Sequence, residues 1–380
     1  MKRFVSLILV MVLVAAWLPV GVSAAPAEVA AKSAILMDAA TGQVLYEQNA
    51  HEMLPPASVT KVMTMLLIME AIDSGRIGWD DTVTASETAA AKGGSQVYLK
   101  VGETMTVTDM VKSIAVSSAN DCACAMAEHI AGSEAAFVDA MNEKAKVLGM
   151  EHTHFVNCTG LDDDPDAAQH LTCAADIAAM SRELMVKHPD IRKFTTIWMD
   201  TIRNGTFGLS NTNKLVRFYP GATGLKTGFT QKAGYCLSAT AQRDGMELIA
   251  VVMGSESSKD RFHACKQLLD YGFANFALVQ PQTQTGFVPV KLGAADQVQA
   301  VPQEEIKLLV DKQQRNQVVI KTELEEMLTA PVSKGQRLGT VTVLVGEQVL
   351  AQIPMLAEQA VPKLTWGQMF LRLLRRACMG

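Results

Sequence analysis

The sequence predicts an α+β protein with one large mixed domain, a small all-β domain and a C-terminal amphipathic helix. Strand hairpins lie on both sides of the helical patterns that fill residues 58–187. A polar, proline-marked stretch at residues 280–286 precedes a part rich in Val, Gln and Thr. Strands that enclose helices within one segment favour a single sheet with helices packed on it, because each apolar face must be buried.

The chain has 380 residues, of which 49% are hydrophobic and 19% charged. This length and composition are typical of a globular protein with a large core and a second domain. The formal net charge of −5 provides no basic field. Composition therefore gives no indication of a nucleic-acid partner.

The first 24 residues predict a secretory signal peptide, and hence an exported protein. Lys2 and Arg3 precede an apolar run, and residues 22–24 (Val-Ser-Ala) are the small residues of a cleavage site. An uncleaved membrane anchor is the alternative, since an apolar run of about 17 residues approaches spanning length. Pro19 and Gly21 favour cleavage because they break the helix just before that site.

The cysteines predict buried small side chains and neither a disulfide framework nor a metal site. Their count of seven is odd, which is unusual for paired cysteines in an exported chain. The pair two positions apart lies in a helical pattern, where such residues do not share a face. No metal and no other cofactor is expected. The seven are Cys122, Cys124, Cys158, Cys173, Cys236, Cys265 and Cys378.

The large domain opens with a hairpin whose strands cover residues 33–38 and 43–48, joined by a turn that ends at Gly42. Residues 58–73 then form a long apolar pattern entered from Pro55-Pro56, which predicts a mostly buried helix. Further helical patterns follow at residues 107–114, 121–130, 134–148 and 173–187.

Strands return near residue 224. Residues 235–241 and 246–253 are joined through Asp244-Gly245, a strong hairpin signal, and residues 224–228 are expected to pair beside them. These strands and the first hairpin would form one antiparallel sheet. A helix at residues 262–273 would pack on it.

The C-terminal part predicts a small β domain and a terminal helix. Residues 317–322 and 339–345 alternate as strands do, and the domain carries no acid, His or Cys cluster, so a spacer or interaction module is expected. The predicted organisation is a signal peptide at 1–24, a large domain at 25–279, a β domain at 287–360 and an amphipathic helix at 364–380.

The terminal helix predicts a peripheral membrane contact. It gathers an apolar stripe on one side and arginines on the other, the pattern of an interfacial helix. The alternative is a helix that docks on the protein's own core. The stripe is Trp366, Met369, Phe370, Leu373 and Leu374, and the arginines are Arg372, Arg375 and Arg376.

Three short motifs carry the chemistry. Ser58 and Lys61 are one helical turn apart, so a lysine made neutral could take the serine's proton, although this spacing alone arises about once or twice by chance in such a chain. Ser118-Ala119-Asn120 precedes a helical pattern, where an ordinary N-cap is the alternative. Lys226-Thr227-Gly228 ends a predicted strand and is the most informative of the three.

In this order and context, the motifs resemble those of the penicillin-binding proteins and serine β-lactamases. The sequence resembles the low-molecular-mass penicillin-binding proteins that are D-alanyl-D-alanine carboxypeptidases, over residues 35–272 and most closely at 219–230. The resemblance implies a transpeptidase-like domain, with helices on both faces of an antiparallel sheet and a helical subdomain. It also implies removal of the terminal D-alanine from peptidoglycan pentapeptides, control of cell-wall cross-linking and acylation by β-lactams.

The same resemblance implies the residue roles. Ser58 would be the nucleophile, Lys61 its general base, and Ser118 the group that passes the proton to the leaving amine. Lys226 would hold that hydroxyl and Asn120 the substrate peptide bond, while the backbone N–H groups of Ser58 and Phe229 would form the oxyanion hole. Thr227, beside Gly228, and Arg261 would hold the substrate carboxylate.

The sequence departs from the family at two positions, and Arg261 has an alternative interpretation. Ala119 stands where many relatives have Gly, which is tolerated if its φ is negative. Phe229 stands where some relatives have His, a difference expected to alter the rate or substrate range and not the type of activity. Arg261 could instead be a solvated charge at a helix start, and His170, after an acidic loop, is given no role.

Two rival functions remain. A serine β-lactamase would resemble class A enzymes in a Glu-x-x-x-Asn pattern, which does not occur between residues 151 and 172. A peptidoglycan-binding protein of low turnover would have no reason to keep a nucleophile beside an amine.

Overall fold

The computed structural model describes residues 26, 28–163, 165–281 and 285–379, and these form two compact units. The predicted signal peptide at residues 1–24 lies outside the described residues. The units divide between Asn275 and Phe276. This division precedes the proline-marked stretch, because the strand that starts at Phe276 pairs with a strand of the second unit.

The first unit is built on one five-stranded antiparallel sheet, as the sequence predicted. Its strand order is β2-β1-β9-β8-β7, so the N-terminal hairpin joins the later strands through β1 and β9. The edge strand β7 carries the third sequence motif. The strands are β1 (Ser33–Asp38), β2 (Val44–Gln48), β7 (Ala222–Thr230), β8 (Gly234–Arg243) and β9 (Met246–Ser255).

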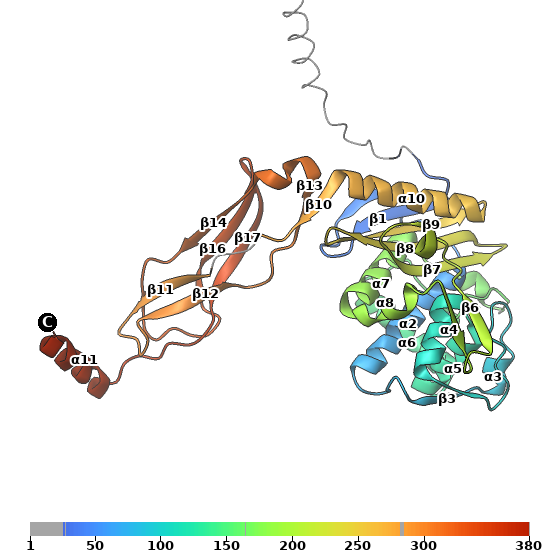
Figure 1. Ribbon diagram of the computed structural model, residues 1–380, viewed down its shortest axis with the longest axis horizontal. Helices are drawn as coiled ribbons and strands as arrows, with labels where there is room; N and C mark the ends of the chain where they lie inside the picture. Colours follow the sequence, from blue (N-terminus) through green and yellow to red (C-terminus); the bar gives the residue numbers. More distant parts are fainter. Residues whose placement is uncertain (1–25, 27, 164, 282–284, 380) are drawn as a thin grey trace, which may run out of the picture. The chain divides into compact units, whose positions relative to one another are not determined.

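Helices cover both faces of this sheet (Figure 1). Helix α10 (Ser258–Asn275) packs on β8 and β9, while α7 (Ala174–Lys187) packs on β1 and β9 from the opposite face. Strand β9 is therefore buried along nearly its whole length, and its continuous run of apolar residues reflects contact on both faces.

A helical subdomain packs beside α7 and supplies the first and second motifs. At its centre lies α2 (Lys61–Asp73), whose residues are almost all buried. It is surrounded by α4 (Val107–Ser117), α5 (Asn120–Ala131) and α6 (Glu134–Val147). The smaller elements are β3 (Thr82–Thr84), α3 (Glu87–Ala90), β4 (Thr104–Thr106), α8 (Arg192–Thr195), β5 (Met199–Ile202), β6 (Phe207–Ser210) and α9 (Leu215–Phe218), with 3₁₀ helices η1 (Ala57–Thr60), η2 (Ala167–Gln169) and η3 (Pro189–Ile191).

The second unit is mostly β-structure, with a six-stranded sheet of order β14-β16-β17-β12-β11-β15 and a separate pair β10-β13. Side chains alternate between core and solvent, so Val288 and Val290 are buried while Phe287 is exposed. The strands are β10 (Phe276–Val279), β11 (Gly286–Lys291), β12 (Gln297–Pro302), β13 (Leu308–Asp311), β14 (Val318–Leu324), β15 (Leu328–Thr329), β16 (Arg337–Val345) and β17 (Gln348–Ala357), with the 3₁₀ helix η4 (Lys312–Gln317).

The last element is α11 (Trp366–Met379), which lies within the range of 364–380 that the sequence predicted. Trp366, Phe370 and Leu374 are exposed, so these described members of the apolar stripe do not dock on the protein's own core. Arg372 instead pairs with Asp296 of the same unit. Among the described residues, no helix has the length and apolar character needed to cross a membrane.

Candidate active site

Ser58 lies in the 3₁₀ helix η1 and not in the α-helix that was predicted to begin there. The α-helix starts one turn later, at Lys61. Ala57, directly before Ser58, has a positive φ of 48°, which lies outside the right-handed helical region, so the chain bends just before the serine. The hydroxyl of Thr60 donates to the Ala57 carbonyl at 2.8 Å and helps to hold this bend. Ser58 is thus placed at a turn and is only partly buried.

The bend is also held by a close backbone approach from residues 157–161. A Cβ on Gly160 would lie 1.9 Å from the Ala57 carbonyl oxygen, and Gly160 has a φ of +81°. Both observations require glycine at this position. The side chain of Asn157 organises the same loop, since its oxygen accepts from the N–H groups of Thr159 and Gly160.

Lys61 is fully buried and reaches Ser58. Its Nζ lies 3.0 Å from Ser58 Oγ and donates to the carbonyl of Thr159 at 2.8 Å. Burial lowers the pKa of Lys61 to about 7, although Cys158 and Asp121 act in the opposite direction. Near neutral pH a large fraction of this amine is therefore unprotonated and can act as a base towards the serine hydroxyl.

His170 is a structural hydrogen-bonding residue next to this turn. Its Nδ1 accepts from the Val156 N–H at 3.1 Å, which places the proton on Nε2. Nε2 then lies 2.9 Å from Thr60 Oγ1 and can donate to it. The imidazole therefore orients the hydroxyl that holds the Ala57 bend.

The Ser118-Ala119-Asn120 motif forms the turn between α4 and α5. Ser118 has a left-handed φ of 62°, whereas Ala119 has a φ of −57°, the sign that an alanine tolerates. Asn120 is the first residue of α5 and caps nothing, so the N-cap interpretation is wrong. Its Nδ2 donates to the Gly93 carbonyl at 2.7 Å. Ser118 Oγ and Asn120 Oδ1 are buried, and neither has a hydrogen-bond partner among the described residues.

Lys226, Thr227 and Gly228 lie on the edge strand β7, where it passes η1. A Cβ on Gly228 would lie 2.6 Å from the Pro56 carbonyl oxygen, so glycine allows the strand and the turn before Ser58 to touch. Lys226 is buried and its Nζ donates to the Thr227 carbonyl at 2.9 Å. Burial, reinforced by the positive charges of Lys61 and Arg261, holds the pKa of Lys226 well below its usual value.

Arg261 is buried beneath β7, so the interpretation as a solvated charge is wrong. Its Nη1 donates to the Gly228 carbonyl at 2.9 Å, while its Nε has no hydrogen-bond partner among the described residues. Phe229 lies at the surface, 50% exposed and stacked on Tyr235 with ring centroids 4.3 Å apart. Phe229, which follows the third motif, is therefore part of an exposed aromatic pair and is not buried in the site.

The ion pairs among the described residues include none of the cations Lys61, Lys226 and Arg261. The carboxylate of Asp121, one of the charges that acts on Lys61, is bound by the N–H groups of Val97 and Leu99. Arg261, together with Lys61 and Lys226 when these are protonated, forms a buried basic group without an ion-pair partner among the described residues, which favours an anionic ligand.

Sequence reasoning missed Thr159, Gly160 and Thr212. Thr212 Oγ1 lies 2.6 Å from Thr227 Oγ1, and its N–H donates to the Val116 carbonyl at 3.2 Å, which links the end of α4 to β7. The available signal was a pair of polar turns, Asn-Cys-Thr-Gly at 157–160 and Asn-Thr-Asn at 211–213. These two turns could be recognised as parts of the site only after the fold showed that both lie beside the three motifs.

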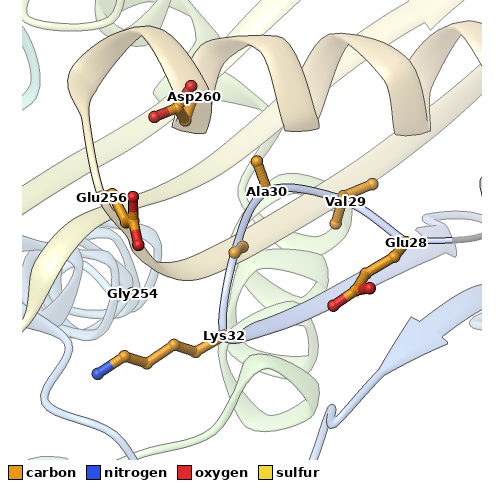
Figure 2. A pocket seen from close by; sticks show the side chains of 8 residues that line it. Glu28, Val29, Ala30, Lys32, Gly254, Glu256 and Asp260 are labelled. Atoms are coloured by element: carbon orange, nitrogen blue, oxygen red, sulfur yellow. The ribbon is translucent and has the colours of Figure 1, made fainter.

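Two pockets differ in their relation to this site. One is lined by Gly93, Lys92, Thr159 and Leu161, and thus adjoins the carbonyls that hold Asn120 and Lys61. The other, shown in Figure 2, lies between residues 28–32 and the start of α10. None of the predicted site residues lines it. It carries Lys32 and acidic side chains, one of which, Asp260, accepts from Ser257.

Comparison with known proteins shows which family this chain is similar to. The family profile described as D-alanyl-D-alanine carboxypeptidase matches residues 20–257, and that of the penicillin-binding protein 5 C-terminal domain matches residues 273–363. The D-alanyl-D-alanine carboxypeptidase DacF of Bacillus subtilis is 44% identical over 340 residues, which cover 88% of this chain and 86% of that protein.

Solved structures show the same similarity. Penicillin-binding protein 5 from Haemophilus influenzae has a TM-score of 0.77 at 29% identity, covering 90% of this chain and 100% of its own. Penicillin-binding protein D2 from Listeria monocytogenes, in its ampicillin-bound form, has a TM-score of 0.60 at 33% identity, covering 65% and 99%. The similarity thus extends over both units.

Proposed function

Because the chain belongs to the D-alanyl-D-alanine carboxypeptidase family of low-molecular-mass penicillin-binding proteins, we propose that it removes the terminal D-alanine from peptidoglycan pentapeptides through an acyl-enzyme on Ser58. The family is one of serine peptidases, and the activity it performs limits cell-wall cross-linking by shortening the donor peptide. The proposal assigns the chemistry to this chain's own residues.

The observation that carries the proposal is the pair formed by Ser58 and Lys61. Their side chains are 3.0 Å apart, and burial brings the lysine pKa to about 7. A serine hydroxyl is a weak nucleophile until a base removes its proton. An amine that is neutral near physiological pH and lies within hydrogen-bond distance is able to do this.

The first half-reaction follows from this pair. Ser58 Oγ attacks the carbonyl carbon of the penultimate D-alanine while Lys61 Nζ takes the hydroxyl proton. When the tetrahedral intermediate collapses, the C–N bond breaks, Ser118 donates a proton to the leaving D-alanine amine, and Ser118 takes in its place the proton that Lys61 accepted from Ser58. With substrate bound, Lys226 would hold the Ser118 hydroxyl. The buried Ser118 oxygen, without a partner among the described residues, supports this role.

We assign the oxyanion hole to the backbone N–H groups of Ser58 and Phe229. The contact between Gly228 and the backbone of Pro56 supports this, because it brings the strand next to the nucleophile turn. Donors fixed by backbone cost no reorganisation when the charge develops. Water then attacks the ester carbonyl while Lys61 Nζ takes its proton; the C–O bond breaks, Lys61 returns that proton to the leaving Ser58 Oγ, and the shortened peptide is released.

Binding of the peptide is assigned to Asn120 and to the buried cations. Asn120 Oδ1, buried and without a partner among the described residues, would accept from the substrate's amide N–H. The terminal carboxylate would lie near Thr227, Lys226 and Arg261. Its negative charge would raise the depressed pKa of Lys226 again, so that binding and protonation of that lysine favour each other. No cofactor takes part in these steps.

The test measures two reactions of the full-length chain in parallel. We expect D-alanine release from a peptide that ends in D-Ala-D-Ala, together with stable covalent labelling by a reporter penicillin. Rapid hydrolysis of the penicillin without D-alanine release would establish a β-lactamase instead. Labelling or binding without turnover of either substrate would establish a peptidoglycan-binding protein.

We further propose that the protein is exported through a signal peptide at residues 1–24 and is held at the outer face of the cytoplasmic membrane by the helix at 364–380. The predicted domain bounds of 25–279 and 287–360 are retained as part of this proposal. The exposed Trp366 and Phe370 on α11 support the membrane contact. Deleting residues 366–380 should move the protein from the membrane fraction to the soluble fraction, and persistence at the membrane would contradict this.

A further inference from the structure

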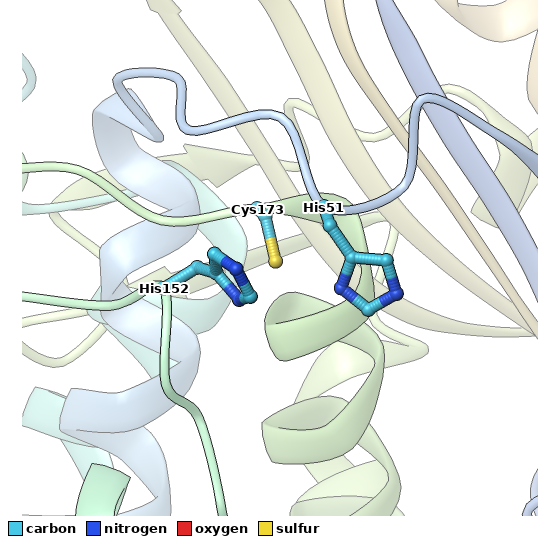
Figure 3. Close-up of side chains that lie close together, drawn as sticks. All are labelled: His51, His152 and Cys173. Carbon is cyan, nitrogen blue, oxygen red and sulfur yellow. The ribbon is translucent and has the colours of Figure 1, made fainter.

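Three side chains that could bind a metal converge on one place outside the catalytic residues (Figure 3). His51 follows β2, His152 lies in the loop after α6, and Cys173 directly precedes α7. One ligand atom from each lies within 4.8 Å of the others. The two imidazole rings are tilted, with centroids 5.4 Å apart. The sequence predicted no metal site because His51 lies about a hundred positions before His152, and the three residues have no ligand spacing.

Backbone hydrogen bonds fix the three segments independently of these side chains. They join the residue before His51 to the first turn of α7, and they join both loops to the residues just before Cys173. The pairs are Ala175 N with Ala50 O at 3.0 Å, Leu54 N with Thr172 O at 2.7 Å, Thr172 N with Leu54 O at 3.0 Å, and His154 N with Leu171 O at 2.9 Å. The positions of the three ligands are therefore set by the fold and not by the ligands themselves.

Asp176 connects the remaining parts of the cluster. Its Oδ2 accepts from the His152 N–H at 3.0 Å and from the Thr153 hydroxyl at 2.7 Å. Its own N–H donates to Cys173 Sγ at 3.4 Å, so the sulfur caps α7. This N–H···S bond orients the sulfur, while burial raises the pKa of the Cys173 thiol to about 12, so a metal ion would have to displace the thiol proton.

We propose that His51, His152 and Cys173 form a zinc-binding site with two imidazole ligands, one thiolate and a water molecule in the fourth position. Imidazole and thiolate are the ligands that zinc prefers. In a tetrahedral site, bonds of about 2.1 Å to nitrogen and 2.3 Å to sulfur place two ligand atoms about 3.4–3.6 Å apart. The three ligand atoms lie within 4.8 Å of one another, so binding would draw them together by up to about an ångström.

The burial of the three side chains indicates how a zinc ion would enter the site. Cys173 is buried, His152 is half-buried and His51 is exposed, so the inner ligand is fixed and the outer imidazole can turn to admit the ion. As the sulfur–zinc bond forms, the thiol proton passes to solvent water. The exposed side beside His51 leaves room for the water ligand.

The site would brace the segments that lead to the catalytic residues. His51 precedes the two prolines before Ser58, and the chain between His152 and Cys173 contains Thr159 and Gly160. A zinc ion would cross-link these two segments to α7. This role goes beyond the proposed peptidase chemistry, which uses no metal.

The experiment uses the full-length chain without an affinity tag, stripped of metal with a chelator. We expect one Zn²⁺ to bind per chain and to raise Tm, and Co²⁺ to give a near-ultraviolet thiolate-to-cobalt band. Cys173→Ser retains a helix cap but should lose both effects. His51→Ala should weaken zinc binding by more than the ~10–100-fold that loss of an outer-sphere partner causes. His154→Ala, at an exposed histidine two residues after His152, is the matched control and should bind zinc as the unaltered chain does.

Three results would overturn the proposal. They are the absence of a zinc-dependent rise in Tm, the absence of a thiolate–cobalt band in the unaltered chain, and an undiminished zinc effect in His51→Ala or Cys173→Ser. Metal binding is measured without substrate. Failure of this proposal is thus distinguishable from failure of the peptidase assignment.

Discussion

Replacing Ser58 with alanine should abolish both covalent labelling by a reporter penicillin and release of D-alanine. Alanine has no oxygen to attack a carbonyl, and the Lys61 amine, 3.0 Å from Ser58 Oγ, would have no proton to take. Loss of the nucleophile in a serine hydrolase lowers kcat by about 10⁶-fold. We therefore expect labelling to fall below detection in a gel-based assay and peptide turnover to approach the uncatalysed rate.

The matched control is Ser74→Ala, at the exposed C-terminal end of α2, the helix that follows η1. It removes an equivalent hydroxyl far from any carbonyl-activating group and should leave labelling unchanged. Ser58→Ala should also melt close to the unaltered chain, because only one partly buried hydroxyl is lost. Labelling that survives in Ser58→Ala would place the nucleophile at another residue and refute the mechanism.

The framework of the fold was predictable from local patterns. The hairpins have turn glycines, β9 is a continuous apolar run, and α10 and α11 have clear helical patterns, so each element could be located without knowledge of its partners. We could predict that the first hairpin pairs with the later strands, because the apolar faces of both must be buried and a single sheet does this. The sequence-predicted sheet and helical subdomain are confirmed for these reasons.

The finer geometry of the site was not predictable, because long-range contacts impose it. Ala57 and Ser118 adopt positive φ, which local sequence disfavours for these residues. Gly160, about a hundred positions from Ala57, is what allows that bend. The position of Thr212 beside the site was also not predictable from local sequence. Neither was the cluster of His51, His152 and Cys173, because the fold brings together loops that are distant in the sequence. Arg261 was predicted near the site, but its burial and its bond to Gly228 required the fold.

A second large effect is expected for Lys61→Arg. Arginine keeps a positive charge at this position but remains protonated throughout the accessible pH range, so it cannot take the Ser58 proton. If Lys61 acted only as a cation that attracts the substrate carboxylate, Arg would preserve much of the rate. As the general base, its loss should slow acylation by about 10²–10⁴-fold. Stopped-flow measurement of acylation by a reporter penicillin separates these two roles.

Two further variants make the Lys61 result interpretable. Arginine is larger than lysine and the site is fully buried, so Lys61→Met is needed as a variant of similar length without an amine. It should lose acylation as Lys61→Arg does. Lys232→Arg, at an exposed lysine in the turn after β7, should acylate normally. Rapid acylation in both Lys61 variants would assign the base to another group.

The pH dependence of acylation gives an independent test, since a burial-lowered lysine pKa of about 7 falls inside the accessible range. Only the neutral amine is a base, and its fraction grows as pH rises. The second-order acylation rate constant should therefore rise about tenfold per pH unit below pH 7 and level off above pH 8. An unperturbed lysine would instead give a rate that still climbs at pH 9. That rise to a plateau should be absent in Lys61→Arg, because its remaining slow acylation no longer depends on a titrating base. A plateau near neutral pH thus requires the burial of Lys61 and its contact with Ser58 together, and either one alone would not produce it.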